Sequence, residues 1–140
     1  MKMINDQLNA EVDWKNRTIL IVEDVEPNYL FLKSALEKTQ AKIEHAVSGT
    51  EAIKKCIEDT NIDLVLMDLH MPGISGHAAT REIKKLRPDL TIIAHTAFVF
   101  SGERQKSLES GCDDYIAKPI RSNELILKIK NCLIKAGKDA

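Results

Sequence analysis

The sequence contains no apolar run that approaches the roughly 18 residues needed to span a bilayer, and its first residues lack the hydrophobic stretch of a signal peptide. Neither sign of charge dominates, because 20 basic and 21 acidic residues leave a net charge of −1. No overall field therefore attracts nucleic acid or an anionic membrane. We expect no membrane insertion, no direct nucleic-acid binding and a cytoplasmic location.

The sequence contains only three cysteines, and their spacing suggests no disulfide or metal-binding pair. Cys56, Cys112 and Cys132 form an odd set without CxxC spacing, which predicts reduced packing thiols in a reducing compartment. The four histidines have no metal-ligand spacing, so we interpret them as surface or packing residues, with His95 pointing away from any functional crevice. Internal repeats and low-complexity segments are absent. A chain of 140 residues with these properties predicts one domain with its own core.

Short apolar segments alternate with helical patterns along the chain. The predicted strands are Thr18–Val22, Lys42–Val47, Asp63–Met67, Leu90–Ala94 and Tyr115–Ala117. The first, third and fourth are continuously apolar, as expected of strands covered on both faces. Helical patterns fill the gaps, the first with Pro27 in its opening turn and the last with Ser122 as an N-cap.

The alternation predicts an α/β fold of the (βα)₅ type, with a parallel sheet, right-handed connections and helices on both faces. Periodicity alone does not determine the strand order. Residues 1–16 are polar and lack sustained periodicity, so we expect an N-terminal tail or linker, followed by a domain at 17–136 and a C-terminal tail at 137–140.

Polar side chains follow the predicted strands at the points where they end. Glu23 and Asp24 come directly after the first strand, Asp68 after the third, Thr96 after the fourth and Lys118 after the fifth. The carboxyl ends of parallel strands meet at one edge of a sheet, where open sheets of this kind bind ligands. These separated positions are therefore expected to converge.

Three converging carboxylates would repel one another, at a cost of about 4 kcal/mol per pair at ~4 Å and an effective dielectric of ~20. A cation among them removes this cost, and oxygen-only ligands suit Mg²⁺. A metal ion, the lysine Lys118 and the hydroxyl of Thr96 around one aspartate are what phosphoryl transfer requires. Asp68 would be the nucleophile and would form an aspartyl phosphate.

With these residues in place, the chain resembles the receiver domains of two-component response regulators, which include chemotaxis-regulator-like proteins. The matching stretches are ILIVED, DLVLMDLHMPGISG, IIAHTA and DDYIAKPI. Together, in this order and spacing, they are highly specific, and the likeness runs from about Thr18 to Ala136. The resemblance implies a single doubly wound, flavodoxin-like domain with strand order 2-1-3-4-5.

The resemblance also implies a role for each site residue. Asp68 would be the phosphoacceptor and Asp24 a direct Mg²⁺ ligand, with Glu23 acting through a metal-bound water and the backbone carbonyl of His70 completing the protein's share of the coordination. Lys118 would contact a phosphoryl oxygen.

Further implied features lie around this centre. Pro119 would follow Lys118 through a cis peptide bond. Thr96 and Tyr115 would form the switch pair, in which the hydroxyl moves toward the phosphoryl group and the ring turns inward. Phe98, two residues past Thr96, is bulky and apolar; we expect it to impede the attacking water and to lengthen the lifetime of the phosphorylated state.

The expected function is that of a phosphoacceptor signalling module. It would take a phosphoryl group from a histidine kinase or histidine phosphotransfer domain, assist only its own phosphorylation and dephosphorylation, and engage partners or dimerise through the face formed by residues 101–136. The weakly apolar helix Ser101–Ser110 suits an element that shifts between two packings. A free-standing receiver and the receiver of a hybrid histidine kinase both remain open.

Two other functions compete with this one. An aspartyl-phosphate-forming phosphatase or phosphotransferase acting on a small molecule would need a second aspartate two residues past the nucleophile, and His70 occupies that position. A flavin-binding protein would need a Ser/Thr/Gly-rich phosphate loop after the first strand, where Glu23 and Asp24 would instead repel the phosphate. The first of these is retained as the alternative.

Overall fold

The sheet consists of five parallel strands in the order β2-β1-β3-β4-β5. The structure is a computed structural model that describes residues 12–97 and 102–138. The strands are β1 (Thr18–Val22), β2 (Lys42–Ala46), β3 (Ile62–Asp68), β4 (Thr91–Thr96) and β5 (Asp114–Ala117). The helices are α2 (Glu26–Leu36), α3 (Gly49–Glu58), α4 (Gly76–Leu86), α5 (Glu103–Glu109) and α6 (Ser122–Lys135), with a short 3₁₀ turn at Glu37–Thr39. The predicted fold class is confirmed.

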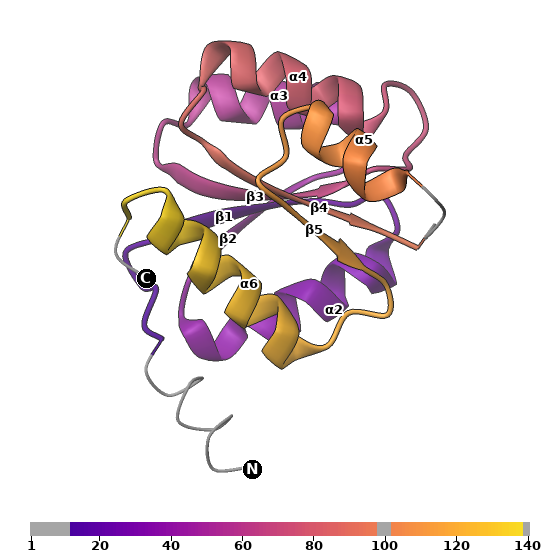
Figure 1. Cartoon of the computed structure of the whole chain (residues 1–140). Coiled ribbons are helices and arrows are strands. Elements are labelled where there is room, and N and C mark those ends of the chain that lie inside the picture. Colours follow the sequence, from indigo (N-terminus) through magenta and orange to yellow (C-terminus); the bar gives the residue numbers. More distant parts are fainter. Residues whose placement is uncertain (1–11, 98–101, 139–140) are drawn as a thin grey trace.

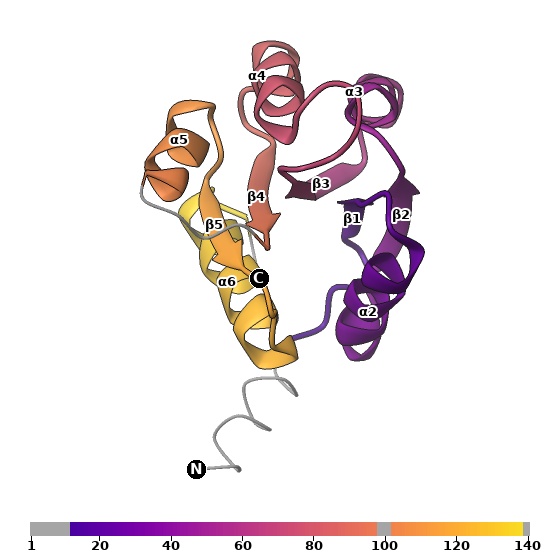
Figure 2. The same ribbon diagram turned by 90° about the vertical axis from the view of Figure 1, so that its right-hand side faces the viewer.

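Helices α2 and α6 cover one face of the sheet, and α3, α4 and α5 cover the other (Figures 1 and 2). Side chains alternate along each strand, so a strand buried on both faces contributes to two cores. In β1, Ile19 and Ile21 pack on the side of α2 and α6, whereas Leu20 and Val22 pack in the core on the opposite side. This explains why the first, third and fourth strands are continuously apolar.

The helix starts follow local sequence signals in most cases. Pro27 lies in the first turn of α2, and the side chains of Ser48 and Ser75 accept a backbone N–H at the starts of α3 and α4. The expected N-cap at Ser122 is wrong. Arg121 has the extended backbone of the cap residue, so Ser122 is already the first helical residue of α6.

The expectation that residues 1–16 lie outside the core is wrong for Val12 and Trp14. Both are buried in the core on the side of α2 and α6, and the backbone N–H of Trp14 donates to the carbonyl of Thr39 at 2.7 Å. Two apolar residues in a short polar segment produce no periodic signal, yet they are enough to cover the end of a core. Residues 1–11 lie outside the described residues.

The predicted C-terminal tail, 137–140, also contacts the domain where it is described. The ammonium of Lys138 donates to the carbonyl of Asp63 at 3.0 Å and lies 3.4 Å from the hydroxyl of Thr91. Residues 139 and 140 are outside the described part of the chain.

Strands β3 and β4 run further than their apolar segments. Asp68 pairs with His95, and Thr96 pairs with Ala117, so the ladder continues into the polar residues at the strand ends. These residues are therefore held by sheet hydrogen bonds and not by a loop.

Candidate functional site

The alternation of side chains brings three charged groups to one place. Glu23 continues the row of Ile19 and Ile21 beyond β1, and Asp68 and Lys118 continue the equivalent rows of β3 and β5 on the same face. Asp24 adds a second acidic residue after β1. Carboxylate oxygens of Glu23, Asp24 and Asp68 lie within 4.8 Å of one another, so the predicted convergence is confirmed.

Glu23 is fully buried and held at both carboxylate oxygens. Its Oε1 lies 3.2 Å from the ammonium of Lys118, and its Oε2 accepts the backbone N–H of Val25 at 3.1 Å. Its carbonyl oxygen lies 2.8 Å from Nε2 of His45. These contacts fix the carboxylate and the lysine relative to each other.

Asp68 is 5% exposed, and its Oδ1 accepts the backbone N–H of His70 at 3.0 Å. Burial raises the pKa of Asp68 to about 7, and the negative charge of Glu23 adds to this increase, while the bond from His70 and the charge of Lys118 oppose it. The single positive charge of Lys118 does not balance the negative charges of Glu23, Asp24 and Asp68. An additional cation would restore the charged form of Asp68, and the oxygen-only donor set fits a hard divalent ion such as Mg²⁺.

The turn after Asp68 is fixed by the first residue of α4. A Cβ on Gly76 would clash with the carbonyl of Asp68 and would lie 2.7 Å from Cα of Leu69, so only glycine permits this close approach. The N–H of Gly76 donates to the carbonyl of Leu69 at 3.2 Å, and the N–H of Leu69 donates to the carbonyl of His95. The position of Asp68 thus depends on backbone contacts from two neighbouring elements.

The remaining predicted residues surround this pocket. Thr96 is fully buried, and its carbonyl accepts the N–H of Lys118 at 2.8 Å. Tyr115 is half-buried against the core on the side of α3, α4 and α5, and burial raises its pKa. The Lys118–Pro119 peptide bond is cis, as the resemblance implies. Phe98 lies outside the described residues, so its expected effect stays a prediction.

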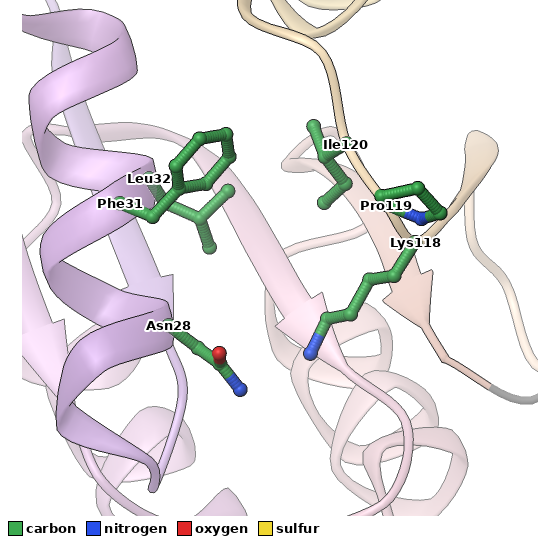
Figure 3. A pocket seen from close by; sticks show the side chains of 6 residues that line it. All are labelled: Asn28, Phe31, Leu32, Lys118, Pro119 and Ile120. Atoms are coloured by element: carbon green, nitrogen blue, oxygen red, sulfur yellow. The ribbon is translucent and has the colours of Figure 1, made fainter.

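A groove of about 320 Å³ opens next to the acidic pocket, between α2 and the segment after β5 (Figure 3). Figure 3 shows the ring of Phe31 facing Ile120 and Pro119 across the gap, with the side chain of Lys118 at the polar end beside Asn28. Phe31 is 47% exposed, so its ring forms part of the open wall of this groove.

Two residues near the site were not identified from the sequence. His95 is a lateral partner of Asp68, so its side chain lies on the same face; the interpretation that it points away is wrong. Burial, with a smaller contribution from the charge of Lys118, lowers the pKa of His95 to about 3 and keeps it neutral. Glu103, at the start of α5, is 1% exposed. Its neighbours in the sequence give no signal for this burial, because the groups around it, His70 and His77, come from other elements.

Comparison with known proteins agrees with this geometry. The response regulator receiver domain family matches residues 19–130. The chain belongs to this family. It is therefore a receiver domain of two-component systems, a phosphoacceptor signalling module, and the sequence-based identification is confirmed.

Individual relatives carry this domain in longer proteins. The chain is 40% identical over 129 residues to the transcriptional regulatory protein ResD of Bacillus subtilis (strain 168), covering 90% of the chain and 52% of that protein. It is 37% identical to the sensor protein GacS of Pseudomonas syringae pv. syringae, covering 76% of the chain and 12% of that protein. The chain thus spans about half, or much less, of the length of these curated relatives.

The fold agrees with solved structures. A CheY-like receiver domain protein from Methanospirillum hungatei JF-1 superposes with a TM-score of 0.80 at 30% identity, covering 86% of this chain and 96% of that one. Within the described residues, the helices are all too short or too polar to cross a membrane.

Proposed function

We propose that the receiver domain accepts a phosphoryl group on Asp68, assisted by Mg²⁺, from a phosphohistidine in a histidine kinase or histidine phosphotransfer domain. The observation that carries this proposal is the arrangement of Asp68. It ends a buried strand, faces Glu23, Asp24 and Lys118, and has a raised pKa that a cation would reverse. The domain assists its own phosphorylation and hydrolysis and turns over no external substrate.

The ion would be held by Asp68, Asp24, the carbonyl of His70 and, through a water molecule, Glu23. When bound, Mg²⁺ would neutralise the negative charge on the oxygens of the phosphoryl group during its transfer. Asp68 Oδ1 accepts the N–H of His70, which leaves Oδ2 to attack phosphorus; the O–P bond forms as the P–N bond of the phosphohistidine breaks and the donor's imidazole leaves. The ammonium of Lys118 lies 3.2 Å from Oε1 of Glu23. It donates to an oxygen of the phosphoryl group once that group is bound to Asp68.

The change in charge is then transmitted to the face of α5, β5 and α6. Phosphorylation adds about two negative charges at the pocket. Thr96 and Tyr115 form the switch pair, because Thr96 ends β4 and Tyr115 lies on the neighbouring strand β5. This face, within residues 101–136, is the surface proposed for downstream partners or dimerisation.

The groove beside the pocket supports a protein as the donor. The apolar side chains of Phe31, Pro119 and Ile120 border Lys118, so a partner that packs on them presents its phosphohistidine at the acidic edge. A cytoplasmic location fits the three cysteines, which are all unpaired and buried. We include Val12 and Trp14 in the domain, because both belong to the core.

Incubation with acetyl phosphate and Mg²⁺, followed by intact mass measurement, tests the acceptor. We expect the wild-type protein to gain the mass of one phosphoryl group and Asp68→Asn to gain none. Asp89→Asn is the matched control, because Asp89 is exposed at the opposite edge of the sheet, and it should be labelled like the wild type. A mass gain retained in Asp68→Asn would assign the phosphoryl group to another residue.

The proposed role of Phe98 has its own test. If its ring impedes the attacking water, Phe98→Ala should lose its phosphoryl group faster than the wild type after the donor is removed. A rate that is unchanged or slower would contradict this role.

A further inference from the structure

A polar cluster adjoins the turn that follows Asp68. It consists of the exposed His70 and of four buried residues, His77, Glu103, Ser107 and Ser110, and we call it the Glu103 cluster. These residues come from the turn after Asp68, from α4, and from α5 and its C-cap. Glu103 is 1% exposed and His77 is 4% exposed, so a carboxylate is buried among groups that must satisfy it.

The hydroxyl groups determine which nitrogen of His77 carries a proton. Ser110 Oγ donates its hydrogen to the carbonyl of Ser107 at 2.8 Å, so it accepts from Nδ1 of His77 at 3.2 Å. Burial lowers the pKa of His77, which favours the neutral ring and leaves Nε2 without a hydrogen. This bare nitrogen lies 3.7 Å from Glu103 Oε1 and cannot donate to it.

Glu103 therefore depends on His70. Nε2 of His70 lies 3.3 Å from Glu103 Oε1, and Glu103 Oε2 has no hydrogen-bond partner among the described residues. Burial of a carboxylate with so few donors is unfavourable, so the bond from His70 has a large influence on where the start of α5 can lie.

The same histidine is bound to the phosphoacceptor. The backbone N–H of His70 donates to Asp68 Oδ1 at 3.0 Å, while its imidazole reaches Glu103. Burial and, after it, the charge of Glu103 raise the pKa of Tyr115. One buried side chain of α5 thus contacts the acceptor turn through His70.

We propose that Glu103 is a positioning residue for the phosphoryl-transfer reaction. In the unphosphorylated domain it holds the imidazole of His70 away from Asp68 and fixes the start of α5. A phosphoryl group on Asp68 offers oxygen acceptors to the Nε2–H of His70, the group that otherwise donates to Glu103. When the imidazole turns toward them, Glu103 loses its donor and the first turn of α5 moves to hydrate the carboxylate. This inference rests on the proposed phosphorylation of Asp68.

Linkage gives the direction of the effect. If the His70–Glu103 contact exists only in the unphosphorylated state, its removal favours the phosphorylated state. We expect Glu103→Ala to raise the ratio of the phosphorylation rate to the dephosphorylation rate, with acetyl phosphate and Mg²⁺, by about fivefold or more, in the usual range of coupling between sites. Glu103→Gln, which keeps the size and one acceptor oxygen, should lie between Glu103→Ala and the wild type.

The matched control is Glu109→Gln. Glu109 is exposed on the same helix and accepts from Gln105 at 3.1 Å, so this variant removes the same charge without altering the Glu103 cluster. Its rates should equal those of the wild type. Equal acceleration in Glu109→Gln and Glu103→Gln would overturn the proposal, because the effect would then come from the net charge of α5.

A double-mutant cycle separates positioning from a structural role. In a His70→Ala background, Glu103→Ala should change the rate ratio by less than about twofold, because its partner is already absent. The same fold-change in both backgrounds, or a change in Tm without a change in the rate ratio, would overturn the proposal. If Glu103→Ala does not fold, Glu103→Gln replaces it in the cycle.

Hydrogen exchange provides a measurement on the unmodified chain. Phosphorylation should accelerate exchange of the backbone amides of α5 and leave those of α4 unchanged. Unchanged exchange in α5 would overturn the proposal. A wild-type protein that takes up no phosphoryl group would instead refute the proposed function itself, so the two failures are distinguishable.

Discussion

Helices α4 and α5 lie on the same face of the sheet (Figures 1 and 2), but they are held in different ways. Helix α4 has 11 residues and buries Ala79 and Ile83 in the core. Helix α5 has seven residues, and the two that it buries are polar, Glu103 and Ser107. Apolar contacts are non-directional and indifferent to charge, whereas buried hydrogen bonds depend on the charge state of their surroundings.

The end of α4 is held as firmly as its middle. The guanidinium of Arg87, its C-cap residue, donates to the carbonyls of Cys56, Asp59, Thr60 and Ile62. Helix α5 instead begins after Gly102, which has a φ of +86°, and its C-cap residue Ser110 is followed by Gly111, which has a φ of +110°. The comparison indicates that α4 forms a fixed support for the acceptor turn, while α5 is free to respond to what happens there.

The largest expected effect tests the apolar attachment of α4. Ile83→Ala should lower the free energy of unfolding by about 2–5 kcal/mol, because it removes a fully buried side chain and leaves a cavity. Urea denaturation followed by Trp14 fluorescence measures this loss. The rate of labelling of the folded protein should not change. Leu86→Ala is the control, since Leu86 is 58% exposed on the same helix, and an equal loss there would contradict this account of α4.

A smaller effect is expected from acid, and it should come from His77 of α4, which contacts the buried Glu103 of α5 and the cap residue Ser110. Because burial lowers the pKa of His77, the unfolded chain binds a proton at this residue at a higher pH than the folded domain does. The stability contributed by neutral His77 is therefore present above about pH 6.5 and is lost as the pH falls below it. His77→Gln should lose less Tm on acidification than the wild type.

The same measurement of Tm against pH in Ile83→Ala separates the effect of a titrating group from that of apolar packing. This variant should lose Tm on acidification as steeply as the wild type, because its defect involves no titrating group. Asp68 contributes in the opposite direction, because its raised pKa makes stability fall as the pH rises toward about 7. This contribution is the same in the wild type, His77→Gln and Ile83→Ala, so it cancels when their Tm values are compared. Identical pH dependence of the wild type and His77→Gln would contradict the assignment.

The smallest effect concerns a single hydrogen bond within α5. Ser107 is fully buried, and its hydroxyl donates to the carbonyl of Glu103 at 2.9 Å. Ser107→Ala should reduce the free energy of unfolding by about 1 kcal/mol, the usual net value of one such bond. Gln105→Ala, an exposed change on the same helix, should stay within about 0.5 kcal/mol of the wild type. A loss in Ser107→Ala as large as that in Ile83→Ala would remove the distinction between the two helices.

The sequence predicts the fold because its signals are local and repeated. Apolar runs place the strands, and the polar residue that follows each run places Glu23, Asp68 and Lys118 at one edge. Parity along the strands then determines that these three side chains share a face. None of these steps requires knowledge of distant contacts, which explains why they succeed.

The residues that escaped prediction depend on contacts between distant segments. Nothing near Glu103 in the sequence distinguishes it from a solvated helix residue, because its burial comes from His70 and His77 on other elements. Trp14 lies in a polar segment, and its burial comes from the carbonyl of Thr39 and the core on the side of α2 and α6. His95 alternates correctly with its neighbours, but histidine is intermediate in its tendency to be buried, so its type does not predict the buried position that it occupies.

The segments around Trp14 and Lys138 are both attached at the same end of the strands. Trp14 leads directly into the start of β1, and Lys138 bonds beside the first residues of β3 and β4, at the carbonyls of Asp63 and Asp89. Both of these contacts lie at the amino ends of the strands, at the rim opposite Asp68, so neither segment covers the acidic pocket where it is described.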